Sequence, residues 1–351
     1  MRVYRLEIES EEPLLVTGPK VGNISGPERE ILTGITLRGA LLYRAFKEGR
    51  SSLIEELREP KLIFHPAYPA SEAGISEPAH PFIYKCKLCE GDVAEDHLEK
   101  IRKNPLELVG TIYPHLCERG RHLFSMKSLG GKLVVKKDGT YVQFKGLEFV
   151  RMEAVGMSKR FRNSEVGMVY NYLCFAPGSR FQGLIVDLSE DRLQLLGYRE
   201  DEEYELRLGR GGSRGLGHSI LKLTCEEGFL RRLIDYIERK LKETSYIFLK
   251  AKAPIYGLKA LDDGFHVRSY LEIPPLKLEG EWITGTERIS GFSLQTGYPK
   301  AMIKAAKPGS LYLYRPPEDV EGEELVEILV RASLVGLEPF NHLGLNLLEV
   351  V

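Results

Sequence analysis

The sequence predicts an α+β protein built from two β-α-β-β-α-β units, each an antiparallel sheet backed by two helices. The chain opens with an alternation of period two, in which charged residues separate Tyr4, Leu6 and Ile8; this is typical of a half-buried strand. Later segments show the period of an amphipathic helix. Each half also ends in a helix, a loop and a strand, as "GLGHSILKLT" and "HLGLNLLEVV" suggest, although the likeness is not a formal repeat.

Two segments carry the clearest helical patterns. Residues 36–49, "TLRGALLYRAFKEG", are predicted to form a helix that Thr36 caps and Gly49 ends. Residues 226–244 place apolar side chains at steps of four over nearly their whole length. We expect this second helix to join the two halves of the chain.

Shorter elements fill the remaining parts of both units. Residues 132–144 predict a hairpin that turns at Asp-Gly. Residues 189–198 predict a short helix capped by Ser189, and residues 323–336 predict a longer one. Residues 218–225 alternate with period two and predict a strand.

The domain prediction places a boundary at the start of the joining helix. Residues 1–226 are expected to form a first domain, and residues 227–351 the joining helix and a second domain. From about 59 to 130 the chain is rich in proline and shows no sustained period. We interpret this stretch as an insertion into the first domain with little regular structure.

The composition excludes several classes of protein. The chain has 351 residues and a net charge of -1, so any nucleic-acid-binding surface must be a local basic patch. No run of 18 apolar residues predicts a membrane span, and the first ten residues predict a strand rather than a signal peptide. Five cysteines in a chain of this size do not form a disulfide framework, and we expect a cytoplasmic protein.

A glycine-rich stretch, "LGRGGSRGLGHSI" at 208–220, is the most distinctive motif. It has no lysine of a Walker A loop, and it is followed by a strand rather than by the helix that a dinucleotide fingerprint requires. Glycines allow the main chain to approach phosphate, and successive amides can form an anion-binding nest. Within 205–222, four basic residues face one acidic residue, a local excess of +3. The motif favours a loop that holds an RNA backbone; the alternative is an irregular turn with solvated arginines.

A cluster of cysteine and histidine residues in the insertion predicts a structural zinc site. Cys86 and Cys89 form one knuckle, and Cys117 with His122 forms another, which gives four ligands for tetrahedral zinc. His115 is an alternative fourth ligand. Zinc would supply folding energy to a segment without an obvious core. A redox pair, or unbonded cysteines beside surface histidines, are the competing interpretations.

Several stretches, in order along most of the chain, resemble RAMP proteins, the ferredoxin-like RNA-binding subunits of CRISPR effector complexes. The similar stretches are "ITLRGALLYRAF", "RNSEVGMVYNYLCFAPGSRFQGLIVD", "GRGGSRGLGHSILKL" and "ISGFSLQTGYPKAMIKAAKPGSLYLY". The cysteine-rich "HPFIYKCKLC" region is most similar to the III-D version of the two-domain subunit at the foot of type III complexes. In one departure, the second half holds a single glycine, Gly344, where a second glycine-rich loop is expected.

The resemblance implies tandem ferredoxin-like domains that grip the 5′ repeat-derived handle of CRISPR RNA. It further implies contacts with a large polymerase-like subunit and a backbone RAMP subunit. The expected RNA-binding residues are Gly209, Arg210, Gly211, Gly212, Ser213, Arg214, Gly215, Gly217, His218, Arg38, Arg160, Arg162 and Lys300. RAMP ribonucleases use a general base such as histidine near the first helix, and residues 25–50 contain none. We therefore expect a non-catalytic subunit; a CRISPR-RNA-processing endoribonuclease and a zinc-stabilised protein scaffold are the alternatives.

Overall fold

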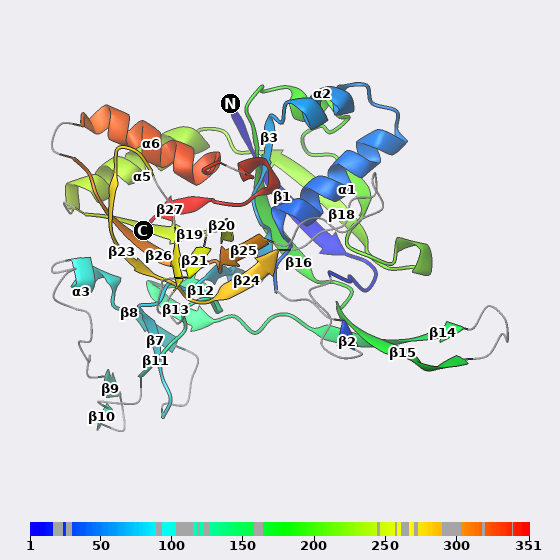
Figure 1. Cartoon of the computed structure of the whole chain (residues 1–351), viewed down its shortest axis with the longest axis horizontal. Helices are drawn as coiled ribbons and strands as arrows, with labels where there is room; N and C mark the ends of the chain where they lie inside the picture. Colours follow the sequence, from blue (N-terminus) through cyan, green and yellow to red (C-terminus); the bar gives the residue numbers. More distant parts are fainter. Residues whose placement is uncertain are drawn as a thin grey trace. The chain divides into compact units, whose positions relative to one another are not determined.

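The computed structural model describes most of the chain and divides it into two compact units (Figure 1). The described residues are 1–16, 24–25, 30–88, 93–102, 115–117, 120–122, 126–157, 164–243, 246–256, 258–260, 267–269, 273–289, 303–317, 320–338 and 340–351. Unit one comprises residues 1–75 and 145–227, and unit two comprises residues 76–144 and 228–351. Within the described residues, no helix is both long and apolar enough to cross a membrane.

Unit one is built on a seven-stranded antiparallel sheet. The strand order is β17 (Glu203–Arg207), β18 (His218–Cys225), β1 (Arg2–Ser10), β16 (Arg180–Asp187), β4 (Tyr68–Ser71) and β5 (Gly74–Ile75), and β3 (Leu62–Phe64) also pairs with β16. The central strand β1 lies between β18 and β16, with Leu6 opposite both Leu223 and Gly183. Residues far apart in the sequence thus meet at the middle of the sheet.

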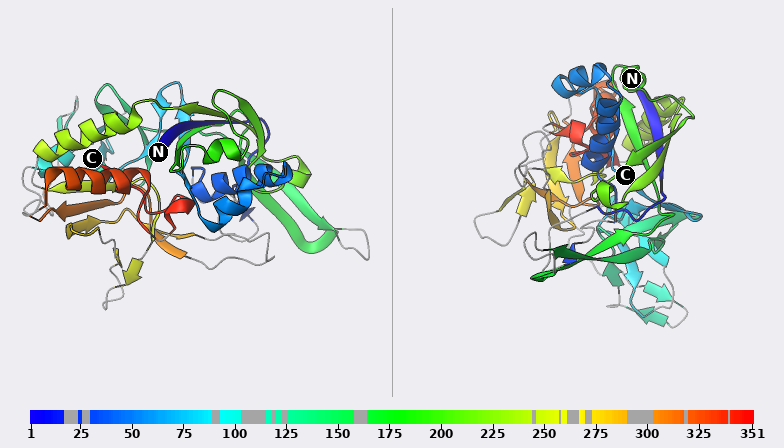
Figure 2. Two further views of the ribbon diagram at one scale, coloured as in Figure 1. Left: turned by 90° about the horizontal axis from the view of Figure 1, so that it is seen from above. Right: turned by 90° about the vertical axis from the view of Figure 1, so that its right-hand side faces the viewer.

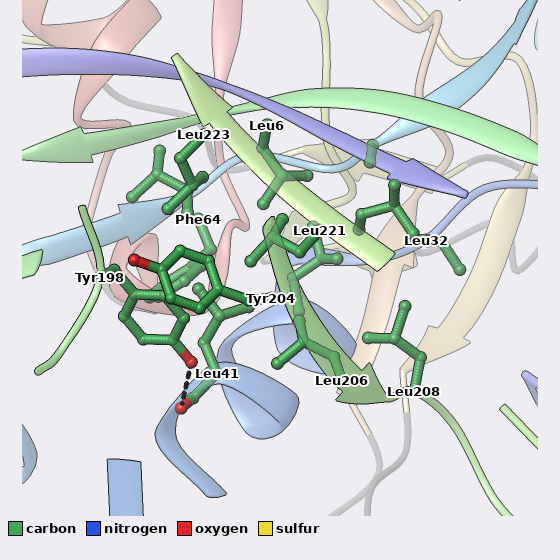
Figure 3. Close-up of a cluster of buried hydrophobic side chains, with 14 of the residues drawn as sticks. Leu6, Leu32, Leu41, Phe64, Tyr198, Tyr204, Leu206, Leu208, Leu221 and Leu223 are labelled. Atoms are coloured by element: carbon green, nitrogen blue, oxygen red, sulfur yellow. Dashed lines mark hydrogen bonds between the residues drawn. The ribbon is translucent and has the colours of Figure 1, made fainter. Parts of the chain in front are cut away.

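Helices α1 (Gly34–Lys47), α2 (Ser52–Arg58) and α4 (Arg192–Leu195) complete unit one. The apolar face of α1 is fully buried, and Figure 3 shows Leu41 among the core side chains, where its carbonyl accepts a 2.9 Å hydrogen bond from the Tyr198 hydroxyl. The helix begins earlier than predicted, because the Thr33 side chain, not Thr36, is the N-cap and accepts from the Thr36 amide. Ser189 likewise does not cap α4, since its hydroxyl donates to Asp187.

A long hairpin projects from unit one, as Figures 1 and 2 both show. It consists of β14 (Phe149–Met157) and β15 (Ser164–Phe175), and the short strand β2 (Ile24–Ser25) pairs with β15. At its base, the rings of Phe149 and Phe175 lie 5.4 Å apart. Phe175 is fully buried in the core of unit one, so the hairpin is anchored at that end.

Unit two contains a four-stranded antiparallel sheet. The strand order is β23 (Lys277–Trp282), β26 (Leu311–Arg315), β19 (Ile247–Ala251) and β27 (Leu348–Val350), with helices α5 (Phe229–Glu243) and α6 (Gly322–Leu334). Ile237 of α5 and Leu329 of α6 are fully buried against one face of this sheet. The helix predicted at 226–244 is therefore confirmed, and it packs within unit two.

Small sheets extend unit two. One contains β20 (Ile255–Tyr256), β25 (Ile303–Ala306) and β24 (Thr286–Ile289), and another contains β21 (Leu258–Ala260) and β22 (Val267–Ser269). A 3-10 turn, η2 (Asn341–Leu343), precedes the last strand. The closing strand predicted within "HLGLNLLEVV" is short, since only Leu348–Val350 pairs with β19.

The predicted insertion is more regular than its sequence suggests. It contributes a six-stranded sheet in the order β11 (Met126–Ser128), β7 (Ile83–Cys86), β8 (Val93–Asp96), β13 (Thr140–Gln143), β12 (Leu133–Lys137) and β6 (Glu77–Pro78), together with α3 (Leu98–Arg102) and the hairpin β9 (His115–Cys117) and β10 (Gly120–His122). The expectation of little regular structure is wrong, because short strands joined by prolines give no sustained sequence period. The predicted hairpin around Asp138 is confirmed as β12 and β13.

Segment 76–144 packs with unit two rather than with unit one. Leu98 and Ile101 of α3 are buried against Phe248, Leu311 and Leu313, which lie on the sheet face opposite α5 and α6. Both faces of the second sheet are therefore covered by apolar packing. This corrects the expected placement of the insertion in the first domain, and the reason is long-range packing that local sequence patterns do not reveal.

Candidate nucleic-acid interface

The glycine-rich loop, residues 208–217, connects β17 to β18 at the edge of the first sheet. The two strands pair up to Arg207 and His218, so the loop closes directly beyond that pair. Gly209, Gly211, Gly215 and Gly217 all have positive φ angles between 72° and 84°. Side chains at such positions are strained, and this explains why the sequence supplies glycine repeatedly.

Most of these glycines are required by the protein's own packing. A Cβ atom at Gly209 would overlap the carbonyl oxygen of Leu15, and one at Gly217 would overlap the carbonyl oxygen of Leu208. At Gly211 it would lie 2.7 Å from Cδ1 of Leu216. Only around Gly215 is there open space. The expectation that glycines admit a ligand's phosphate therefore applies to the outer part of the loop, while the inner glycines admit neighbouring backbone.

Backbone hydrogen bonds fix the loop on the segment that follows β1. The amide of Arg210 donates to the Leu15 carbonyl at 3.0 Å, and the amide of Gly217 donates to the Pro13 carbonyl at 3.0 Å. Leu216 of the loop is buried with Leu15 and Cys174, the last of which belongs to the hairpin strand β15. The loop is thus held from three sides and has a defined shape before any ligand binds.

The outer part of the loop presents backbone amides. Gly211 is left-handed and is followed by a 3-10 turn, η1 (Gly212–Arg214), and such a pair of conformations directs successive amides to one side. The amides of Arg214 and Leu216 donate to the Gly211 carbonyl. Within the part of the chain that the structure describes, no residue accepts a hydrogen bond from the amides of 211–213. These three amides are therefore available to an acceptor outside the described residues.

Two exposed arginines flank these amides. Arg210 is exposed and forms no ion pair with any described residue. Arg214 is also exposed, and its Nη1 donates to the hydroxyl of Tyr172 in β15 at 3.2 Å. Arg207 lies behind the loop, where its Nη1 donates to the Gly212 carbonyl at 2.8 Å. Arg210 and Arg214 are therefore placed to contact a ligand, and Arg207 supports the turn.

His218 has two acidic neighbours that the sequence did not reveal. Its Nδ1 lies 2.9 Å from Oε2 of Glu11, and its Nε2 lies 3.4 Å from Oε2 of Glu205. The amide of His218 also donates to Glu12. Adding Glu11 and Glu12 to the local count gives four basic against three acidic residues, so the predicted excess of +3 falls to +1. Strand pairing brings these glutamates here, and no local pattern signals it.

Comparisons with known proteins find structural matches of low sequence identity. No protein-family model matches the sequence, and no curated protein matches it. A chain from a cryo-EM structure of the Type III-B Cmr-beta complex bound to cognate target RNA aligns over 98% of this chain and 96% of its own length, with 13% identity and a TM-score of 0.49. A chain from the same complex with target RNA and AMPPnP aligns over 88% and 86%, with 14% identity and a TM-score of 0.47.

A further match is a protein described as an RAMP protein binding different RNA substrates. It aligns over 100% of both chains with 8% identity and a TM-score of 0.36. The description of this match names the family that the sequence motifs resemble.

Four further RNA contacts expected from the sequence are not residues of the loop. Arg38 of α1 is buried, and its Nη1 lies 2.6 Å from Oε1 of Glu56 in α2. Its guanidinium also donates to the Glu56 carbonyl, so the side chain joins two helices inside unit one. The expected contact between Arg38 and RNA finds no support in this geometry, because the guanidinium is buried and bonded to Glu56. Arg160, Arg162 and Lys300 lie outside the described residues.

The predicted zinc ligands are partly described. Cys86 ends β7 and is buried, and its Sγ accepts a 3.4 Å hydrogen bond from the Leu88 amide. The backbone therefore turns back onto the sulfur of Cys86 within two residues. Cys89 lies outside the described residues, and no three metal-ligating side chains cluster among those described.

The second predicted knuckle is described as backbone alone. Strands β9 and β10 pair Gly120 with Cys117 and His122 with His115. The two candidates for the fourth ligand, His115 and His122, therefore lie directly opposite each other on the paired strands. The strand register does not favour one of them over the other. Cys174, by contrast, is fully buried, and burial raises the pKa of its thiol, as expected for an inert core cysteine.

Proposed function

We propose that this protein is a non-catalytic RNA-binding subunit of a type III CRISPR effector complex, and that it grips the 5′ repeat-derived handle of CRISPR RNA. The proposal combines the RAMP resemblance of the sequence with the geometry of the glycine-rich loop. The observation that carries it is the nest of amides at 211–213, which lies between the exposed side chains of Arg210 and Arg214. Amides and guanidinium groups of this kind hold phosphates and position RNA without reading its bases.

The open face of the first sheet supports binding through the loop rather than through the sheet. A groove on this face is lined by Glu7, Glu9 and Glu203 together with Arg180 and Lys222. Lys222 stands opposite Glu7 on one side and Glu203 on the other. Arg180 is paired with Glu9 at 3.0 Å, and Lys222 has a glutamate opposite it on each neighbouring strand. Base-stacking sheets need exposed aromatic side chains, which the groove does not offer.

The surroundings of His218 support a binding role over catalysis. A general base for RNA cleavage needs a free ring nitrogen to take the proton of a 2′-hydroxyl. Both nitrogens of His218 face carboxylates, Glu11 at 2.9 Å and Glu205 at 3.4 Å. In the alternative of a processing endoribonuclease, one of these contacts would have to open.

We further propose that both units are ferredoxin-like. In unit one, the spatial order β18, β1, β16 and β3 corresponds to fourth, first, third and second strand of the β-α-β-β-α-β motif. In unit two, β27, β19, β26 and β23 follow the same order. The helix expected between β19 and β23 has no counterpart among the described residues, where small strands occupy that part of the sequence.

Docking of a large polymerase-like subunit and of a backbone RAMP subunit remains part of the proposal. Exposed apolar side chains on α1 and α2 support contacts with protein: Phe46 is 65% exposed, Leu57 60% and Ile54 58%. Structural zinc, held by Cys86 and Cys89 with Cys117 and one histidine, would fold the part of the insertion around β9 and β10. A zinc-stabilised scaffold that binds protein alone is the second alternative.

Binding and cleavage assays with repeat RNA test these proposals together. The double variant Arg210→Ala/Arg214→Ala should bind handle RNA about tenfold or more weakly. The slope of log affinity against log salt concentration should become shallower by about two, because two phosphate contacts are lost. Lys222→Ala is the matched control, because this lysine lies between two glutamates on the sheet face and should leave affinity unchanged. Unchanged affinity in the double variant would support the scaffold, and metal-independent cleavage by the native chain would support the endoribonuclease.

A further inference from the structure

The segment before β27 in unit two repeats the backbone of the glycine-rich loop with almost none of its glycines. The left-handed residues are Gly211, Gly215 and Gly217 around η1 in unit one, and Phe340, Gly344 and Asn346 around η2 in unit two. Their spacing is identical, and the three φ angles in unit two lie between 57° and 75°. We call residues 340–346 the second loop.

The second loop is also held to the chain in the same way. In unit one, the Gly217 amide donates to the Pro13 carbonyl at 3.0 Å. In unit two, the Asn346 amide donates to the Pro254 carbonyl at 3.0 Å. Pro13 and Pro254 each lie three residues past the end of a central strand, β1 in one unit and β19 in the other. The two units therefore build equivalent loops at equivalent places, and the loops differ in their side chains.

The first left-handed residue of the second loop is a phenylalanine. Phe340 has a φ angle of 75° where unit one has Gly211. This conformation is strained for any residue with a Cβ atom, and bulky side chains rarely adopt it. Asn346, also left-handed, gains a hydrogen bond, because its Oδ1 accepts from the Tyr256 amide at 2.7 Å. Strained residues gather at binding sites, so the conformation of Phe340 indicates a role for its ring.

The ring of Phe340 belongs to an aromatic pair at the surface of unit two. Its centre lies 5.4 Å from that of the Tyr256 ring, and the two rings are nearly perpendicular. Tyr256 is 37% exposed and Phe340 is half-buried, whereas Ile255, the preceding residue of β20, is fully buried in the core. The edge-to-face arrangement leaves ring faces that the partner ring does not cover. The pair therefore offers a flat surface to a ligand.

The groups beside the aromatic pair favour a base over a phosphate. Residues 340–346 contain no lysine or arginine, and Leu343 stands where the first loop has Arg214. Asn341 is half-buried, and its Oδ1 accepts a 3.0 Å hydrogen bond from the His342 amide. Among the described residues, none accepts a hydrogen bond from its Nδ2. An amide donor next to aromatic rings suits the edge and the face of a nucleobase.

We propose that the second loop binds a base of the RNA, which stacks on the rings of Phe340 and Tyr256 while Nδ2 of Asn341 donates to its edge. This inference rests on the proposed RNA-binding function. It adds a base contact in unit two to the phosphate contacts of the first loop. Stacking of this kind tolerates any base, because every base has a π-face. A protein partner is the other occupant that an aromatic pair could take, and the test separates the two.

The test measures the affinity of the full chain for single-stranded handle RNA at two salt concentrations. Tyr256→Ala and Phe340→Gly should each bind about tenfold more weakly, whereas Tyr256→Phe should bind as the native chain does, because it keeps the ring. The losses should be equal at both salt concentrations, since stacking releases no counterions. Phe46→Ala is the matched control, because Phe46 is 65% exposed on α1, outside both loops.

Phe340→Gly should keep the fold, because glycine occupies the equivalent position 211 of unit one, and the thermal unfolding temperature checks this. Native affinity in Phe340→Gly and Tyr256→Ala would overturn the inference and assign the pair to a protein partner. A loss in Phe46→Ala equal to theirs would also overturn it. If Arg210→Ala/Arg214→Ala weakens binding and the ring variants do not, this inference alone fails. If the native chain binds no RNA, the proposed function fails with it.

Discussion

Nδ1 of His218 lies 2.9 Å from Oε2 of Glu11, so the first residue after the glycine-rich loop is bonded to the first residue after β1. This contact joins two ends of neighbouring strands. It also places a negative charge beside the arginines of the loop. The surface that we propose for RNA is therefore a balance of positive and negative groups rather than a uniform basic patch.

Removing that negative charge should strengthen RNA binding. We expect Glu11→Gln to raise RNA affinity about fivefold at low salt, because one charge at close range in water is worth about 1 kcal/mol. The gain should shrink at high salt as screening increases. Filter binding at two salt concentrations measures both effects. Glu190→Gln, which removes an exposed carboxylate paired with the N-terminal amine, is the control. Weaker binding by Glu11→Gln would contradict the proposed interface.

The glycines of the loop should differ in their effects on stability. Gly209→Ala should lower the free energy of unfolding by more than about 2 kcal/mol, because its Cβ overlaps the Leu15 carbonyl and φ is positive. Gly215→Ala should cost about 1 kcal/mol, since only the positive φ opposes it. Gly39→Ala on helix α1 has open space and no positive φ, and should stabilise by about 0.5–1 kcal/mol. Equal losses for the two loop variants in urea unfolding would contradict this order.

The buried pair of Arg38 and Glu56 makes a separate prediction. Arg38→Ala should destabilise the protein by about 3–5 kcal/mol, because it leaves the Glu56 carboxylate buried without its partner at 2.6 Å. The double variant Arg38→Met/Glu56→Leu should recover most of that loss. RNA affinity per folded molecule should stay unchanged in both. A loss of affinity in the folded double variant would instead restore Arg38 as an RNA contact.

Local patterns in the sequence predict local structure well in this protein. The strand at the N-terminus, the helix that became α5 and the hairpin around Asp138 all follow from hydrophobic period and turn residues. The partners of the glycine-rich loop could not be predicted in the same way. Leu15 and Glu11 reach it only because β1 pairs with β18, more than 200 residues further along the chain.

The placement of the insertion illustrates the same limit. Its strands are two to five residues long and give no period, and its apolar residues Leu98 and Ile101 are too few to indicate which sheet they cover. The contact between Glu77 and Lys250 was equally hidden, since these residues are 173 residues apart. From sequence alone, charged residues such as Glu77 and Lys250 are expected to be solvated, and only the packing of their two segments shows otherwise.

The turn at Cys86 predicts bound zinc in the native protein. Elemental analysis should find about one zinc per chain, and Cys86→Ser should abolish it, because the thiolate that accepts from the Leu88 amide is lost. Cys225→Ser is the control, since this cysteine lies in β18 of unit one. Full zinc content in Cys86→Ser, or none in the native chain, would exclude the site.

The ion triplet of unit two, in which Lys250 contacts Glu77 and Glu349, should make stability depend on pH. Burial disfavours the charged form of Glu349, but Lys250 outweighs it and holds the pKa of this carboxyl below its usual value of 4.5. Burial likewise disfavours the ammonium of Lys250, yet Glu349 and Glu77 raise its pKa above the usual 10.5. A carboxyl whose pKa is lower in the folded than in the unfolded chain stabilises the fold at pH values above its unfolded-state pKa. That contribution is lost as the pH falls through its folded-state pKa.

The difference between native protein and Lys250→Met isolates this effect. At pH 7 the variant should be about 1.5–3 kcal/mol less stable, because the half-buried carboxylates of Glu77 and Glu349 lose the ammonium group that both of them contact. Below about pH 4.5 the difference should shrink, since protonation removes the native pair and relieves the variant's unpaired carboxylates. Lys61→Met is the control, because its exposed pair with Glu59 is screened by water and contributes little to stability at any pH. A difference between native protein and Lys250→Met that stays constant from pH 7 to pH 3 in urea unfolding would show that the triplet does not hold its charges as the geometry requires.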